Sequence, residues 1–292
     1  MANVLRWLLG TVLCLLAVSF AGALHPAGDS FAVLRLPLAV LALVLVLILR
    51  RQLWLSLPGL GLASVALLTV LGTGTSGTSS GAPVLIYQKN LKFNNDRQAA
   101  LLADIRSRAP DVITFQEVSR LNRPLMAALA DDWPAQSLCP FTGVGGVAVL
   151  SRWPAVEGSE ICLEGKGLSA LQVVTDTGPV WIVSIHLHWP WPFGQAAQVD
   201  EIIPVLEALE GPRIIGGDFN MVPWSYTLAR FQRATNTARA RTREPTFRTS
   251  PLPIPMTIDH VLAHPRGAGE TTVLPGMGSD HNGILARVHP AE

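Results

Sequence analysis

The chain has 292 residues, 49% of them hydrophobic and 15% charged, with a mean hydropathy of +0.35. Soluble domains carry about 25% charged residues, so this composition argues against a chain that is exposed to water throughout. The apolar excess lies at the front, where residues 1–82 hold only five charged side chains: Arg6, Asp29, Arg35, Arg50 and Arg51. The remainder is globular in composition, long enough for one sizeable core and not basic, so its net charge does not argue for a nucleic-acid partner.

Three apolar runs, at about 4–24, 31–49 and 53–71, approach the roughly 20 helical residues that cross a bilayer. They predict an N-terminal bundle of three transmembrane helices, residues 1–71, although the first run alone is also compatible with a cleaved signal peptide. The basic residues at the ends of these runs favour an inside N-terminus. Everything after residue 72 would then lie outside the cytoplasm.

Residues 72–83, with the sequence GTGTSGTSSGAP, are typical of a flexible linker. Residues 84–292 are therefore expected to form a separate domain. Its only two cysteines, Cys139 and Cys162, form a disulfide if the compartment is oxidising, or else are two unpaired residues of the core.

Strand-like and helix-like segments alternate irregularly after the linker. Apolar strands are expected at 84–91, 111–118, 146–153, 171–190, 212–219, 257–264 and 282–290, and amphipathic helices at 96–110, 123–132 and 195–209. Strands outnumber helices and the connections are of both kinds. This pattern favours an α/β sandwich with mixed sheets over a barrel of regular strand–helix units.

Polar side chains recur where these strands end: Asn90, Glu117 in FQEV, His186 and His188 in HLH, Asp218 and Asn220 in GDFN, Asp259 in IDHV, and Asp280 and His281 in SDH. Each residue alone is compatible with a turn, a helix cap or a solvated strand end. Asp218 and Asn220 are spaced to share one face of an extended segment. The recurrence of such residues in one chain predicts an active site.

In this order the motifs resemble the endonuclease/exonuclease/phosphatase (DNase I-like) superfamily of metal-dependent phosphoesterases, over about residues 83–290. The resemblance implies an α/β (α+β) four-layer sandwich, two mixed β-sheets flanked by helices, with the site at one end. The three expected spans before such a domain resemble a bacterial membrane-anchored branch. This implies a multi-pass protein of the bacterial inner (plasma) membrane, with its catalytic domain on the periplasmic or extracellular side.

The resemblance also assigns roles to the strand-end residues. Glu117 with Asn90 would hold Mg²⁺ (or Mn²⁺), an ion that prefers oxygen ligands, and Asp280 would lie near this metal. Asp218 would activate water and Asn220 would hydrogen-bond the phosphate. His281, oriented by Asp259, and His186 would contact the phosphate during the reaction.

Substrate contacts are less specified. His188 is either a substrate contact or packs locally against nearby tryptophans, and Arg239, Arg241 and Arg243 are either a cationic lip for an anionic substrate or a solvated loop. The expected function is a membrane-anchored, metal-dependent hydrolase of a phosphodiester, as in a nuclease. The alternatives are a sphingomyelinase-like phospholipid or small phosphomonoester hydrolase, and a non-catalytic membrane-tethered binding domain. No obligate protein partner is evident.

Overall fold

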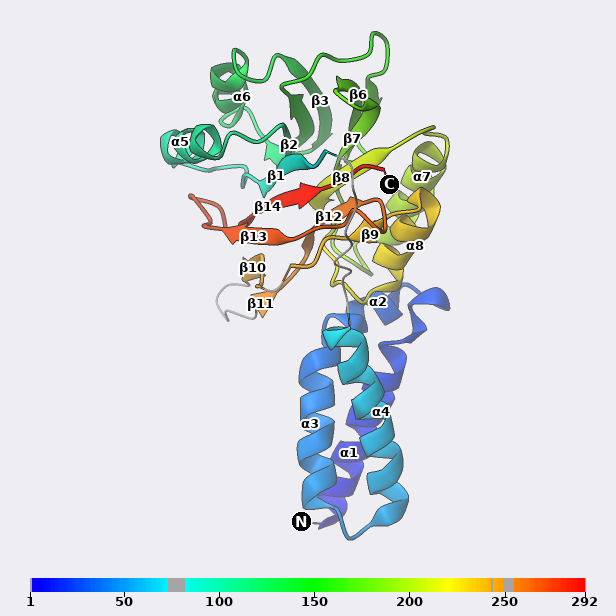
Figure 1. The fold of residues 1–292 in the computed structure, drawn as a ribbon. Helices are drawn as coiled ribbons and strands as arrows, with labels where there is room; N and C mark the ends of the chain where they lie inside the picture. Colours follow the sequence, from blue (N-terminus) through cyan, green and yellow to red (C-terminus); the bar gives the residue numbers. More distant parts are fainter. Residues whose placement is uncertain (1, 73–81, 243, 249–254, 292) are drawn as a thin grey trace. The chain divides into compact units, whose positions relative to one another are not determined.

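The computed structural model describes residues 2–72, 82–242, 244–248 and 255–291 (Figure 1). Two compact units are distinguished. The helical unit comprises residues 1–73, 189–196 and 221–229, and the sandwich unit comprises 74–188, 197–220 and 230–292. The expected linker, residues 72–83, lies mostly outside the described residues.

The elements follow one another in a fixed order. The helices are α1 (Ala2–Val18), η1 (Ala21–Ala23), α2 (Ala27–Ala32), α3 (Arg35–Ile48), α4 (Leu53–Leu71), α5 (Gln98–Arg108), α6 (Arg123–Leu129), α7 (Gln195–Glu207) and α8 (Tyr226–Thr235). The strands are β1 (Val84–Asn90), β2 (Val112–Val118), β3 (Ala135–Thr142), β4 (Gly145–Ser151), β5 (Ile161–Leu163), β6 (Leu168–Thr175), β7 (Gly178–His186), β8 (Arg213–Asp218), β9 (Ala238–Arg239), β10 (Phe247–Arg248), β11 (Pro255–Met256), β12 (Asp259–Ala263), β13 (Thr271–Leu274) and β14 (Gly283–Val288).

In the helical unit, α1, α3 and α4 pack on one another through a small apolar core that includes Leu9, Leu16 and Leu45. Polar contacts join these helices to the unit's two later segments. The Asp29 carboxylate accepts hydrogen bonds from the backbone N–H groups of Tyr226 (2.7 Å) and Thr227 (2.8 Å), the first residues of α8. Such a carboxylate satisfies N–H groups that have no partner within a helix.

The prediction of three transmembrane spans is wrong for the described part of the chain, where no helix combines the length and apolarity needed to cross a membrane. The first expected span ends early, because α1 stops at Val18, and the second is broken between α2 and α3. A hydropathy window averages across such breaks and cannot detect them. Arg35, which falls within the second expected span, is buried and donates to Ser19 and to the Trp224 carbonyl oxygen. The predicted localisation as a multi-pass protein of the inner membrane depends on these spans and is therefore wrong as well.

Two six-stranded sheets build the sandwich unit. The strand order is β13-β14-β1-β2-β4-β3 in the first sheet and β5-β6-β7-β8-β12-β9 in the second, while β10 and β11 form a separate pair. Both large sheets are mixed, because the β1–β2 and β7–β8 pairs are parallel and the other pairs are antiparallel. The predicted mixed-sheet sandwich is confirmed.

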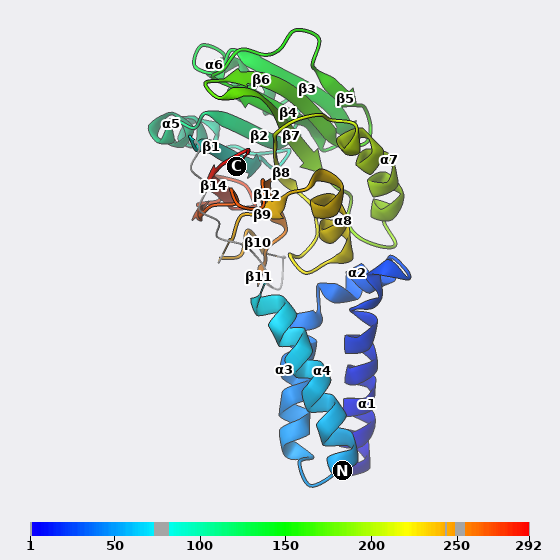
Figure 2. The ribbon, with the colours of Figure 1, turned by 45° about the vertical axis from the view of Figure 1, so that its right-hand side comes forward.

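Apolar side chains fill the space between the two sheets, including Ile86 and Val112 of the first and Ile182 and Ile214 of the second. A second core, around Phe115, lies on the outer side of the first sheet, where α5 and α6 cover it (Figure 2). Helix α7 lies beside the second sheet. Strands buried on both faces account for the long apolar runs in the sequence.

A disulfide links the two sheets. Cys139 on β3 of the first sheet is bonded to Cys162 on β5 of the second, at a sequence separation of 23. The alternative of two unpaired core cysteines is therefore wrong. The fold brings together two cysteines that lie on different sheets, which periodicity alone could not reveal.

Gly216 on β8 brings the sheets close together near the polar strand ends. A Cβ atom at this position would lie 2.4 Å from Thr114 Oγ1 on β2, far inside van der Waals contact. Because Thr114 belongs to the opposite sheet, the absence of a side chain at Gly216 allows the two sheets to approach here.

Candidate active site

Three neighbouring strands of the second sheet end in ionisable residues at the same level. His186 on β7 is in register with Asp218 on β8, and Asp218 is in register with Asp259 on β12. All three side chains are buried. The strand pairing therefore places an imidazole and two carboxylates side by side, although they are far apart in sequence.

The first sheet contributes Asn90 and Glu117 from the ends of β1 and β2. Asn90 Nδ2 donates to Glu117 Oε1 (3.2 Å) and to Asp218 Oδ2 (3.0 Å), and so connects the two sheets. Glu117 has a positive φ of 56°, at the point where the pairing of β2 with β4 becomes irregular. This left-handed conformation is unusual for a residue with a side chain and is often found at functional sites.

His281 lies just before β14 and pairs with Asp259, at 2.9 Å from Nδ1 to Oδ2. Burial by itself lowers the pKa of His281, but the charges of Asp259 and Asp218 outweigh it and raise this pKa to about 9. Burial likewise acts to raise the pKa of Asp259, but the charge and hydrogen bond of His281 bring the net pKa below its usual value. The pair is thus an imidazolium and a carboxylate at neutral pH.

Asp218 lies between the two histidines. Its Oδ2 is 3.5 Å from His186 Nε2 and 3.7 Å from His281 Nε2. Burial raises the pKa of Asp218 to about 7, against the opposing charge of His281. Burial, together with the charge of His281, lowers the pKa of His186 to about 3, so this imidazole is neutral. One protonated and one neutral histidine therefore flank a carboxyl group that can take up a proton near neutrality.

Asn220 is held in place by its own backbone and side chain. Its N–H donates to Asp218 Oδ1 (2.9 Å), and its Nδ2 donates to the Leu187 carbonyl oxygen (2.7 Å). Like Glu117, it has a positive φ, here 49°. Asn and Asp tolerate this conformation better than most residues, and the tight turn keeps the amide beside the carboxylate.

Two sets of residues could hold a metal ion. Asp218, Asp259 and His281 offer ligand atoms within 4.8 Å of one another, but they already bond to each other, and His281 is protonated. Glu117 forms no ion pair with any described residue, and burial raises its pKa. A partly buried carboxylate without a cation is unfavourable, so the oxygen atoms of Glu117 fit a hard divalent ion, while Asn90 presents its Nδ2 to this carboxylate. Asp280 is exposed and outside the close cluster.

The remaining predicted residues lie apart from this cluster. The His188 ring contacts Phe141, with centroids 4.9 Å apart, and Phe141 also contacts His186. Arg239 is buried on β9, and Arg243 lies outside the described residues.

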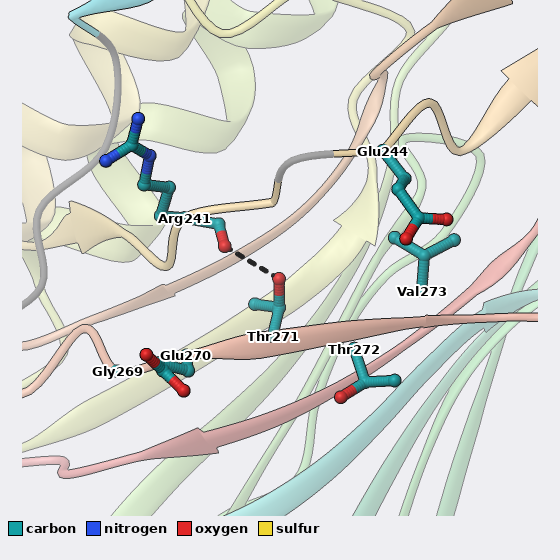
Figure 3. A pocket seen from close by; sticks show the side chains of 7 residues that line it. All are labelled: Arg241, Glu244, Gly269, Glu270, Thr271, Thr272 and Val273. Carbon is teal, nitrogen blue, oxygen red and sulfur yellow. Dashed lines mark hydrogen bonds between the residues drawn. The ribbon is translucent and has the colours of Figure 1, made fainter.

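Arg241 borders a cavity of about 430 Å³ beside β13, lined by none of the cluster residues (Figure 3). Its carbonyl oxygen accepts a hydrogen bond from Thr271, while the guanidinium points away from that strand.

A chain of buried amides behind the site was not predicted from the sequence. Gln88 Nε2 donates to Asp259 Oδ1 (3.1 Å) and to Gln116 Oε1 (2.9 Å), and Gln116 donates to Ser184 on the opposite sheet (3.1 Å). The sequence signal for this chain was a polar residue in the middle of an otherwise apolar strand, because a buried polar side chain needs a hydrogen-bond partner.

Lys89 is a second unpredicted element. It is fully buried and donates to the carbonyl oxygens of Gly276 (2.7 Å) and His281 (2.6 Å). Burial lowers the pKa of this ammonium to about 8. Lys89 thereby anchors the segment that carries His281.

Comparison with solved structures shows the same fold. Sphingomyelinase C from Streptomyces griseocarneus matches with 20% identity and a TM-score of 0.55, covering 72% of this chain and 100% of that chain. D. rerio TDP2 complexed with a single strand DNA product matches with 16% identity and a TM-score of 0.56, covering 72% of this chain and 100% of that chain. A mutant of beta toxin from Staphylococcus aureus with bound magnesium ions matches with 14% identity and a TM-score of 0.55, covering 71% of this chain and 100% of that chain. A comparison with curated protein sequences gives no match.

The family comparison extends over the strands that carry the site. The model of the Endonuclease/Exonuclease/phosphatase family matches residues 87–281, from β1 to His281. This range is more than half of the chain and includes every residue of the buried cluster. The membrane-anchored branch of the family is not supported by these matches. The chain belongs to the Endonuclease/Exonuclease/phosphatase family and is a hydrolase.

Proposed function

We propose that this protein is a divalent-metal-dependent phosphoesterase that hydrolyses a phosphodiester by in-line attack of a water molecule. The observation that carries the proposal is the meeting of Glu117 and Asn90 from one sheet with Asp218 from the other. Asn90 Nδ2 lies within hydrogen-bonding distance of both carboxylates. A cation-binding carboxylate and a proton-accepting carboxyl group are thus held within reach of one small anion.

Glu117 would hold the metal, with Asn90 beside it orienting the carboxylate, and Mg²⁺ is the ion proposed. When bound, it supplies positive charge to the phosphate and to the departing oxygen. The backbone N–H of Phe93 donates to Glu117 Oε2 (2.8 Å) and so fixes the carboxylate orientation. The Asn90 side chain is held from its other end by the backbone N–H of Lys92, 2.9 Å from Oδ1.

Asp218 would accept a proton from the attacking water. A general base works best when its pKa lies near the operating pH, and burial raises the pKa of Asp218 to about 7. Asn220, whose N–H fixes Asp218 Oδ1, would orient the water or a phosphate oxygen. The water oxygen forms the new bond to phosphorus as the ester oxygen leaves.

The two histidines would act on the phosphate. His281, charged because of Asp259, would stabilise the growing negative charge and can give its Nε2 proton to the leaving oxygen. Neutral His186 would donate one hydrogen bond to a non-bridging oxygen. Fixed donors of this kind act without rearranging during the reaction, which makes them effective in stabilising a transition state.

The test is hydrolysis by the purified full chain, with Mg²⁺, of bis(4-nitrophenyl) phosphate, plasmid DNA and sphingomyelin-type lipid under the same conditions. Hydrolysis of at least one diester, abolished by Glu117→Gln and by His281→Ala, is expected. Circular dichroism must show that both variants are folded. Full activity in either folded variant, or no Mg²⁺-dependent turnover of any ester, would overturn the proposal.

A further inference from the structure

A second pocket, of about 330 Å³, adjoins the site within the sandwich unit. We call it the arginine pocket, and its lining includes Ser119, Arg120, Arg123, Pro140, Phe141 and Gly145. Its volume is at the lower end of the range for sites that bind small ligands. It is lined by eleven residues, and none of them is acidic.

The arginine pocket is continuous with the catalytic residues on two sides. Ser119 follows Glu117 by two positions, and a Cβ at Gly145 would lie 2.9 Å from the Glu117 carbonyl carbon. The Phe141 ring lines the pocket and also contacts the His186 ring, with centroids 5.2 Å apart. A ligand in the pocket would therefore be a direct neighbour of a phosphate bound beside Glu117 and His186.

Arg120 and Arg123 are exposed, and neither guanidinium group forms a hydrogen bond or an ion pair among the described residues. His281 and Asp259 of the catalytic cluster, in contrast, are paired with each other. Two uncommitted guanidinium groups beside one pocket favour an anionic ligand. Guanidinium groups match phosphate oxygens with paired hydrogen bonds.

The backbone that carries these arginines is held firmly. Ser119 Oγ donates to the Phe93 carbonyl oxygen (2.6 Å) and accepts from the N–H of Leu121 (3.2 Å). Asn122 Nδ2 donates to the carbonyl oxygens of Lys92 and Glu117, both at 2.9 Å. The turn between Glu117 and α6 thus has a fixed position relative to Glu117.

We propose that the arginine pocket binds a second phosphate group of the substrate, so that the preferred substrate is a single nucleic-acid strand rather than an ester with one phosphate. Arg120 and Arg123 contact the phosphate next to the scissile one, and Pro140 and Phe141 offer an apolar surface to the sugar or base between them. The inference rests on the proposed phosphodiesterase function and assigns its substrate class.

The test compares wild type with Arg120→Ala/Arg123→Ala on two substrates, a short single-stranded oligothymidylate and bis(4-nitrophenyl) phosphate. The double variant should lose roughly 10- to 100-fold in kcat/KM on the oligonucleotide, because it loses charge-assisted hydrogen bonds, and less than about twofold on the single-phosphate ester. The negative slope of log kcat/KM against log salt for the oligonucleotide should become shallower by about 0.7, because one phosphate contact is lost.

Arg51→Ala/Arg287→Ala is the matched control, because both of these arginines are exposed, lie outside the pocket and form no side-chain hydrogen bond among the described residues. It should leave both substrates and the salt slope unchanged. Equal losses on the two substrates, an unchanged oligonucleotide rate, or the same loss in the control would overturn the inference.

A wild type without activity on any ester would contradict the proposed function instead. Fluorescence anisotropy of a labelled oligothymidylate still tests the arginine pocket in that case. Weaker binding by the double variant than by wild type and control supports the pocket, and equal binding by all three overturns it.

Discussion

The two sheets contribute differently to the same site. The second sheet ends in His186, Asp218 and Asp259, which are buried, in register and already engaged with each other or with His281. The first sheet ends in Glu117, which is less buried, has a left-handed backbone and has no ion-pair partner among the described residues. The strand ends of the second sheet form a network of paired proton donors and acceptors. The strand ends of the first sheet present a carboxylate that has no cationic partner among the described residues.

The difference indicates a division of labour that the fold makes easy. Residues that exchange protons need defined mutual distances, which adjacent strands of one sheet supply through their register. A carboxylate that binds a metal needs access from solvent, which a strand end beside an open turn supplies. Mutations at the two edges should therefore fail in different ways.

Glu117→Gln should have the largest effect, with a loss of about 10³-fold in kcat because charge stabilisation at the phosphate is removed. It should also abolish stabilisation by Mg²⁺, which at 100 times its Kd amounts to about 2.7 kcal/mol. Calorimetry with and without Mg²⁺ measures this effect. Glu157→Gln, an exposed carboxylate elsewhere, should behave as wild type. A full Mg²⁺ shift in Glu117→Gln would show that the metal binds elsewhere.

Asp259→Asn should lower kcat by about 10²-fold, because His281 loses the charge that raises its pKa. The variant should keep the stabilisation by Mg²⁺, since Asp259 lies on the other edge. Kinetics and calorimetry on the same preparation separate the two properties. Loss of both properties together would refute the division between the sheets.

Cys139→Ala/Cys162→Ala removes the link between the two sheets and should lower the free energy of unfolding by about 3 kcal/mol, as expected for a loop of this length. Urea denaturation of the variant and of wild type under non-reducing conditions measures the difference. Cys14→Ala, at an unpaired cysteine, is the control and should change little. A double variant as stable as wild type would mean that the sheets associate without help from the disulfide.

Lys89→Met tests the anchor of the His281 segment through pH. The folded-state pKa of Lys89, about 8, lies below its unfolded value of 10.5, so unfolding takes up protons between these values. Wild-type stability relative to Lys89→Met should therefore rise by about 2 kcal/mol from pH 7 to pH 9.5. Urea denaturation at both pH values measures this change. A constant difference would mean that the ammonium is not buried in the folded state.

Much of the sandwich could be predicted from the sequence, because apolar strands with polar ends follow directly from burial on both faces. The convergence of Glu117, Asp218 and His281 followed from the family resemblance rather than from spacing. The supporting hydrogen bonds did not follow. Gln88 and Lys89 lie inside a strand pattern, and only the three-dimensional structure reveals that they donate to Asp259 and to the His281 carbonyl oxygen.

The helical unit was predicted less well than the sandwich. Composition correctly indicated helices at the front, but mean hydropathy contains no information about where a helix stops. The buried contacts of Asp29 and Arg35, close to the breaks between α1, α2 and α3, involve residues almost 200 positions away in the chain. Long-range partners of this kind cannot be read from a local window.

The close approach of the two sheets near the candidate site depends on the absence of a side chain at Gly216. Because a Cβ at Gly216 would meet Thr114 Oγ1 at 2.4 Å, even an alanine there acts as a wedge between the sheets. Such a wedge would alter no catalytic side chain, yet it would widen the gap that Asn90 bridges between Glu117 and Asp218. The clearance at Gly216 thus affects the distance between the carboxylate proposed to bind the cation and the residues proposed to transfer protons.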